Sequence, residues 1–253
     1  MTPESEYRSY LSGKRVALVG PAPSGPDGGS KIDSYDVVVR LNNMVNVPSS
    51  MREHLGSRTD VLYATLDGNP LDLVKSMVDN SVKFVSTSYP ADEWFFRARM
   101  MQNVSILKSL NAFGRVDLKT VVLPSREYFH VKEATSSRPN TGFSAIIDLL
   151  SADIEELYIT GLDFYRSAAN GGAAYMPGYE CQWTEKRGPD FLLENIERDG
   201  PDVHNPDSSF KYFKHEMYAK DDRVKVDSCL LRYLQHPVFE ELSNFFPKGN
   251  DSC

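Results

Sequence analysis

The sequence predicts an α/β fold built on a mostly parallel sheet with helices on both of its faces. Short apolar runs, which indicate buried strands, alternate along the chain with segments of helical periodicity, and this alternation is typical of parallel βαβ units. The 253 residues are 41% hydrophobic and 25% charged, which is enough apolar material for one large core. We therefore expect a Rossmann-like single domain over residues 1–253, with a mobile loop or lid over 165–203, where Gly-Gly and Pro-Gly pairs accumulate.

Strands are predicted where a short, mainly apolar run lies between polar or Gly-rich ends. The run Lys14–Gly20 is expected to be a central strand, and the loop Pro21–Ser30 that follows it contains so many Gly and Pro residues that we expect no regular structure there. In chain order, the predicted strands are Lys14–Gly20, Tyr35–Leu41, Asp60–Ala64, Val82–Ser86, Val104–Leu107, Thr120–Leu123, Glu156–Thr160 and Val224–Val226.

Helices are predicted where apolar residues recur every three or four positions, as Leu71, Val74 and Val78 do. Asp92 and Glu93 are expected in the first turn of a helix, where the helix dipole favours acidic side chains. In chain order, the predicted helices are Met51–Gly56 (a helix or turn), Pro70–Asn80, Asp92–Met101, Thr141–Leu150, a short piece near Phe191–Ile196, and Ser208–Ala219.

Charge, hydropathy and cysteine content argue against a nucleic-acid-binding, a membrane-spanning and a disulfide-rich protein. The net charge of −7 argues against a nucleic-acid-binding protein, which needs a basic face. The first fifteen residues are polar and no apolar run approaches the roughly 18 residues of a membrane span, so we expect neither a signal peptide nor a membrane-spanning segment. Three cysteines, Cys181, Cys229 and Cys253, are too few for a disulfide framework, which favours a soluble protein of the reducing cytoplasm.

A candidate nucleotide site follows the first predicted strand. Gly20 and Ser24 lie in the loop at its carboxyl end, where backbone N–H groups can approach a phosphate and a hydroxyl can donate to it. Asn42 and Asn43 end the second strand at the same edge, and an amide side chain can bind either a phosphate oxygen or a ribose hydroxyl.

A second candidate element is the start of the predicted helix Thr141–Leu150. Thr141 or the preceding Asn140 can cap this helix. The free N–H groups of Thr141 and Gly142, together with the helix dipole, would then form an anion site. Gly161 ends the next strand at the same edge of the sheet.

Together these stretches resemble the two sialyl motifs of the sialyltransferases, glycosyltransferase family 29. The run of residues 31–43, KIDSYDVVVRLNN, is similar to the end of the large motif, and RPNTGFSAIIDLL followed by ELYITGLDF is similar to the small motif. The matching residues of the large motif are Ile32, Asp33, Asp36, Arg40 and Asn42.

The resemblance has two departures. Gly20 is followed by Pro21 where the family has a donor-contacting Asn, and neither motif holds the Cys through which the animal enzymes join them. The resemblance implies the GT-A variant fold of the sialyltransferases and a single glycosyltransferase domain over residues 1–253. The implied activity is inverting transfer of an acidic sugar, sialic acid or Kdo-like, from a CMP-sugar donor to a glycan hydroxyl.

The resemblance also implies a histidine as general base. His204 precedes the predicted helix Ser208–Ala219 and has Asp207 three residues on, as in the very short sialyl motif, so it is the candidate base. His130 is the runner-up, and His215 is expected on a solvated helix face. The other two histidines, His54 and His236, are expected to be structural or exposed.

No metal and no cofactor are expected. The chain lacks Asp-x-Asp and other metal signatures, and a CMP donor carries a single phosphate. Trp94, Phe95 and Phe96 could stack on an acceptor sugar, although such a cluster more often belongs to a core. Two alternatives stay open: another Rossmann-like nucleotide- or S-adenosylmethionine-dependent enzyme, and a non-catalytic nucleotide-sugar-binding homologue. The acceptor and the oligomeric state are not indicated by the sequence.

Overall fold

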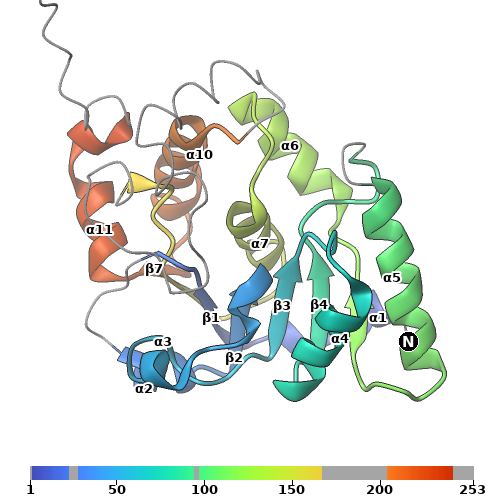
Figure 1. Cartoon of the computed structure of the whole chain (residues 1–253). Helices are drawn as coiled ribbons and strands as arrows, with labels where there is room; N and C mark the ends of the chain where they lie inside the picture. Colours follow the sequence, from blue (N-terminus) through green and yellow to red (C-terminus); the bar gives the residue numbers. More distant parts are fainter. Residues whose placement is uncertain (1, 23–27, 94–96, 167–203, 242–253) are drawn as a thin grey trace, which may run out of the picture.

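The protein is described by a computed structural model that covers residues 2–22, 28–93, 97–166 and 204–241. Within these residues the chain forms one seven-stranded sheet in the order β5-β4-β3-β2-β1-β6-β7 (Figure 1). All its neighbouring strands are parallel, which confirms the predicted α/β, Rossmann-like class. The strands are β1 (Arg15–Val19), β2 (Val37–Leu41), β3 (Val61–Ala64), β4 (Phe84–Thr87), β5 (Lys119–Val121), β6 (Glu156–Thr160) and β7 (Val224–Val226).

At the centre of the sheet, beside β1, the order in which the chain adds strands changes direction. From β1 the strands advance one by one to β5, and the chain then returns to place β6 on the other side of β1. The end of β1 is therefore paired with both neighbours, because Val19 is in register with Arg40 of β2 and with Thr160 of β6. In open parallel sheets, ligands bind beyond the carboxyl ends of the strands at such a reversal.

Alternate residues of the central strands enter two separate cores, because successive side chains of a strand point to opposite faces. Val16 and Leu18 of β1 belong to the larger core, whereas Ala17 and Val19 belong to the smaller one. The sheet is thus covered on both faces, which explains why its strands are continuous apolar runs.

Helices occupy both ends of the sheet as well as its faces. Figure 1 shows α11 beside the end that carries β7, and α4 and α5 at the end that carries β4. Each helix buries apolar residues against a strand or against another helix. The α-helices of the described residues are α1 (Pro3–Leu11), α2 (Gly28–Asp33), α3 (Arg52–Leu55), α4 (Pro70–Asp79), α5 (Arg97–Ala112), α6 (Ser125–Thr135), α7 (Thr141–Leu150), α10 (Pro206–Tyr212) and α11 (Ser228–Gln235).

Shorter helical turns complete the chain. The π-helical η4 (Phe213–Tyr218) continues α10 directly. The others are the 3-10 turns η1 (Asn42–Val45), η2 (Ser49–Met51) and η5 (Pro237–Glu240). No helix of the described ranges is both long enough and apolar enough to cross a membrane.

Three predictions about elements are wrong. The predicted strand Val104–Leu107 lies inside α5, because Met100, Val104 and Leu107 follow helical spacing and all face the core. Asp92 and Glu93 precede α5 and do not form its first turn.

The third wrong prediction concerns the loop Pro21–Ser30, which becomes regular at its end because α2 begins at Gly28. Gly29 explains how α2 can pack closely on α3: an added Cβ would collide with the Arg52 carbonyl oxygen.

Candidate functional site

The candidate site lies at the carboxyl edge of the sheet, where β1 and β6 end side by side. The Gly20 N–H donates to the Thr160 carbonyl and the Ala22 N–H donates to the Gly161 carbonyl, each at 2.8 Å. A Cβ on Gly20 would collide with the Gly161 carbonyl oxygen, and a Cβ on Gly161 would collide with the Gly20 carbonyl oxygen. Glycine at both positions therefore lets the two backbones meet, and Gly161 also adopts a φ of +66°.

Asn42 connects this edge to α7. It has a φ of 46°, a left-handed conformation that asparagine tolerates better than most residues. Its Oδ1 accepts from the Thr65 N–H at 3.1 Å, and its Nδ2 donates to Thr141 Oγ1 at 3.3 Å. The end of the large motif is thereby joined to the start of the small motif. Asn43 is the next residue of η1 and is exposed.

The N-terminus of α7 has the features of an anion site. Asn140 caps the helix, since its side chain accepts the Phe143 N–H at 2.9 Å. The first N–H groups of a helix have no partner within the helix, and in α7 these belong to Thr141 and Gly142, which are both buried. A Cβ on Gly142 would lie 2.9 Å from Leu162 Cδ2, so α7 packs tightly on the turn that follows β6.

His204 lies against the loop that leads into α7. Its Nδ1 is 2.7 Å from the Arg138 carbonyl oxygen, and the neighbouring Asn205 N–H donates to Ser137 Oγ at 2.6 Å. A carbonyl can only accept a hydrogen bond, so Nδ1 carries the proton and Nε2 keeps its lone pair.

The same surroundings keep the His204 imidazole neutral. Burial lowers its pKa from 6.5 to about 4. The hydrogen bond to the Arg138 carbonyl opposes this shift, and the positive charge of Arg138 adds to it.

The remaining histidines, including the runner-up His130, lie elsewhere. His54, His130, His215 and His236 are all exposed, and His215 Nε2 is 3.6 Å from Glu240 Oε1. His204 is therefore the histidine that the structure places beside the two motifs.

Most of the predicted donor-site residues come together. Gly20, Asn42, Thr141, Gly142 and Gly161 come from separate elements and meet at this edge through the contacts described above. Ser24 lies outside the described residues, as do Trp94, Phe95 and Phe96, the predicted short helix near Phe191–Ile196, and residues 167–203, nearly all of the predicted lid.

Three residues of the large-motif resemblance are structural. Asp33 accepts hydrogen bonds from the Ser57 and Arg58 N–H groups. Asp36 accepts from the Arg15 N–H at 2.9 Å. The Arg40 guanidinium is fully buried on the opposite face of β2 from Leu41, where burial lowers its pKa to about 10. It donates to the Leu55 and Arg58 carbonyls and to Thr59 Oγ1.

Asp227 is a site residue that the sequence analysis missed. It is 2% exposed, and its Oδ2 accepts from Thr160 Oγ1 at 2.8 Å and from the Gly161 N–H at 2.9 Å. Its Oδ1 caps α11 by accepting the Leu230 N–H. The spacing of Leu230, Tyr233 and Leu234 after Asp227 is the signal that could have revealed this capped helix.

The turn after β6 was also missed. Phe164 and Tyr165 have φ values of 51° and 66°. Two consecutive non-glycine residues in the left-handed region cost free energy and persist where the surrounding structure imposes them, often at functional sites. The Asp163 side chain supports the turn by accepting the Tyr165 N–H at 3.0 Å.

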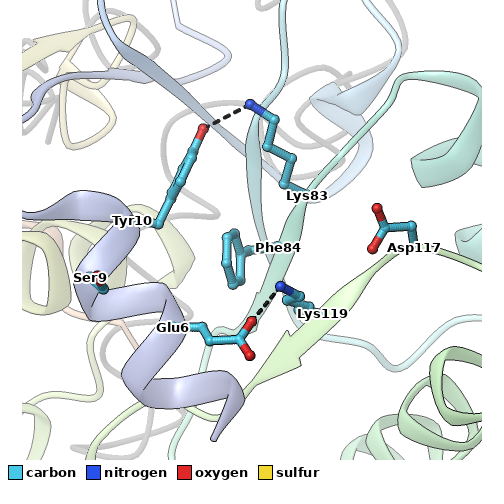
Figure 2. Close-up of a pocket in the computed structure, with 7 residues that line it drawn as sticks. All are labelled: Glu6, Ser9, Tyr10, Lys83, Phe84, Asp117 and Lys119. Atoms are coloured by element: carbon cyan, nitrogen blue, oxygen red, sulfur yellow. Dashed lines mark hydrogen bonds and ion pairs between the residues drawn. The ribbon is translucent and has the colours of Figure 1, made fainter. Parts of the chain in front are cut away.

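A surface pocket lies away from this edge. Figure 2 shows Tyr10, Lys83, Phe84 and Lys119 among its lining residues, which come from α1 and from the amino-terminal ends of β4 and β5. Its lysines are already paired, Lys83 with the Tyr10 hydroxyl and Lys119 with Glu6. This pocket is therefore not the donor site that the motifs indicate.

No protein-family model matches the chain, and no curated protein matches it in sequence. Among solved structures it is similar to the sialyltransferase CstII from Campylobacter jejuni in complex with cytidine-5'-monophosphate, at 15% identity and a TM-score of 0.46, over 85% of this chain and 79% of that one. It is also similar to a mammalian sialyltransferase in complex with Gal-beta-1-3GalNAc-ortho-nitrophenol (17%, 0.49, 87% and 71%).

A third similar structure is the monofunctional alpha-2,3-sialyltransferase Cst-I from Campylobacter jejuni (13% identity, TM-score 0.47, 85% of this chain and 75% of that one). The chain is thus similar in overall structure to sialyltransferases. At these identities and TM-scores the similarity by itself assigns no activity.

Proposed function

We propose that the protein is an inverting, metal-independent glycosyltransferase that moves an acidic sugar from a CMP-sugar donor to a glycan hydroxyl. One observation carries the proposal: the two motifs meet at the switch point of the sheet through the Asn42–Thr141 hydrogen bond, and the neutral His204 is bonded to the Arg138 carbonyl in the loop that leads into α7. The donor is a CMP-linked nonulosonic acid such as sialic acid, or CMP-Kdo.

The donor phosphate would bind the N–H groups at the start of α7, with Thr141 and Gly142 as the residues closest to it. Asn42, Asn43 and the backbone near Gly20 and Gly161 would hold the rest of the nucleotide. Ser24 completes this predicted set.

His204 would act as the general base. As the acceptor oxygen bonds to the anomeric carbon, its proton passes to His204 Nε2 and the bond from that carbon to the phosphate oxygen breaks. The attack occurs from the face opposite the leaving CMP, so the configuration of the anomeric carbon inverts.

The low pKa of His204 makes it a weak base in the free protein, since bases work best when their pKa lies near the working pH. A CMP-sugar brings a phosphate and a sugar carboxylate to this edge, and both negative charges favour the imidazolium. We therefore expect the donor to raise the pKa of His204, which a pH titration of the histidine NMR signals with and without CMP would measure.

The proposed reaction needs no metal or other cofactor, because CMP is a leaving group with one phosphate. Full turnover in the presence of EDTA is the expected result. The GT-A assignment, a cytoplasmic location and the absence of nucleic-acid partners also stay predictions.

The proposal is tested by measuring CMP release from CMP-N-acetylneuraminic acid and CMP-Kdo, with lactose as a simple glycan hydroxyl and UDP-galactose as the control donor. The wild type should release CMP, His204→Asn should lose at least a hundredfold in kcat, and the exposed His130→Asn should match the wild type. Equal turnover by His204→Asn would refute the role of His204. CMP binding without turnover would favour a non-catalytic homologue.

A further inference from the structure

Arg166 is a fully buried cation with no role in the proposed chemistry. It lies just beyond the strained turn that follows β6, and its side chain is 0% exposed. An arginine has five N–H donors, and all five are used. They donate to the carbonyl oxygens of Phe164, Pro206, Phe239 and Glu240 and to Asp207 Oδ1.

These bonds join three stretches that are far apart in the sequence. They are the turn after β6, the first turn of α10, and η5 near the end of the described chain. The Arg166 guanidinium also lies over the Phe210 ring of α10, with Cζ 4.1 Å from the ring centroid. The start of α10 is thereby fixed against the carboxyl end of β6.

His204 lies two residues before Pro206 and is held from both directions. On one side, His204 and Asn205 bond to the Arg138 carbonyl and to Ser137 Oγ. On the other side, the Arg166 guanidinium donates to the Pro206 carbonyl and, at 2.8 Å from Nη2, to Asp207 Oδ1. The segment that carries the imidazole is therefore anchored both to the loop before α7 and to the end of β6.

The charge of Arg166 persists at neutral pH. Burial lowers its pKa to about 10, and Asp207 and Asp163 oppose this shift. A buried ion pair adds little net stability compared with apolar residues of the same volume, but its hydrogen bonds fix direction and distance. An apolar residue could fill this space without fixing the position of α10.

We propose that Arg166 is a positioning residue, which sets the place of the His204 imidazole relative to the donor edge by holding the start of α10. The inference rests on the proposed function, in which His204 is the base. It also predicts something that does not depend on activity: the Nδ1–H tautomer of His204 requires Arg166.

Arg166→Lys tests this proposal, because lysine keeps the charge but cannot make the five bonds. We expect its kcat with CMP-N-acetylneuraminic acid to fall at least tenfold while KM for the donor changes less than twofold. The acidic limb of the pH–kcat profile, which reports protonation of the base, should shift, and nitrogen-15 NMR should show loss of the single Nδ1–H tautomer of His204.

Arg223→Lys is the matched control. Arg223 also bridges separate elements, donating to the Leu150 and Ala152 carbonyls and to Asp221, at the opposite end of α7 from His204. The Arg223 variant should lose stability while keeping the kcat, the pH profile and the His204 tautomer of the wild type.

If Arg166→Lys does not fold, Asp207→Leu replaces it, because leucine has a similar volume but accepts no hydrogen bond from Arg166. A fall in kcat with the same tautomer change would support the proposal. An unchanged tautomer in a folded Arg166→Lys or Asp207→Leu protein would overturn it. If the wild type neither binds nor turns over a CMP-sugar, the proposed function fails and the tautomer measurement alone decides the role of Arg166.

Discussion

Gly161→Ala tests the close approach of β1 and β6 that forms the candidate site. The new Cβ would collide with the Gly20 carbonyl oxygen and lie 3.0 Å from the Ala22 carbonyl oxygen. Both are backbone atoms, so no side chain can move aside to relieve the contact. Gly13→Ala is the matched control, since Gly13 has the same φ of +66° and no heavy atom within 4 Å of an added Cβ.

The difference between the two variants isolates crowding from backbone strain. A left-handed conformation costs a residue with a Cβ roughly 1–2 kcal/mol, and this cost applies to both variants. Forcing an extra carbon into a packed region costs about 1–3 kcal/mol more, and this applies to Gly161 alone. We therefore expect a loss of roughly 2–5 kcal/mol for Gly161→Ala and roughly 1–2 kcal/mol for Gly13→Ala.

Urea denaturation followed by circular dichroism measures both free energies of unfolding, and calorimetric titration with CMP measures the site. Gly161→Ala should also weaken CMP binding, because it separates the two strand ends, whereas Gly13→Ala should not. Equal losses of stability in the two variants, with equal CMP affinity, would refute the close approach and the site built on it.

Three further predictions concern single side chains. Thr141→Val removes the hydroxyl that accepts from Asn42, so calorimetry should show CMP affinity about tenfold weaker, with a stability loss of roughly 1 kcal/mol; unchanged affinity would count against this contact. Because the pKa of His204 is lower in the folded than in the unfolded state, the unfolded state takes up the proton first as the pH falls. The wild type should thus lose roughly 2–3 kcal/mol more stability than His204→Gln between pH 7 and pH 4.5, and parallel urea series at these two pH values that fall equally would contradict the shift. Asp148→Ala leaves the buried Tyr63 hydroxyl without its acceptor, so thermal unfolding should show a loss of roughly 2–3 kcal/mol with CMP affinity unchanged.

The elements that the sequence predicted best have clear local signals at both of their ends. The strand Glu156–Thr160, the helix Thr141–Leu150 and the strand Val224–Val226 appear with the predicted bounds. Their limits follow from local features, such as the Asn140 cap of α7 and the glycine after β6. Local pattern was sufficient for β6 and α7 because both are largely buried; β7 lies at the edge of the sheet, and its alternation of Val224, the exposed Lys225 and Val226 indicates a strand.

Short apolar runs at the periphery were ambiguous. Val104–Leu107 satisfies a strand pattern when it is considered alone, and its helical character depends on Met100 one turn before and on the strands that α5 covers. A four-residue run cannot distinguish the two periods.

The supporting residues of the site could not be found from local pattern. Four of the five bonds of Arg166 reach partners that lie 40 to 74 positions away in the sequence. The contacts of Asp227 with β6 and the following glycine span 66 and 67 positions. The family resemblance pointed to Asp33, Asp36 and Arg40, which proved to be structural, and to Asn42, which reaches the site edge. The face of the strand that a motif residue occupies, together with long-range packing, decides whether it lies at the site edge or supports the fold.

The most direct test of the donor-site proposal is the thermal stability of the protein without metal, in the presence of CMP, UMP, GDP or S-adenosylhomocysteine. At a hundred times its dissociation constant, CMP should stabilise the fold by roughly 2.7 kcal/mol, which is about 5–10 °C for a chain of this size. Thr141→Val should require a higher CMP concentration for the same shift. No stabilisation by CMP, together with a clear shift by S-adenosylhomocysteine, would contradict the CMP-sugar assignment and indicate a different Rossmann-like enzyme.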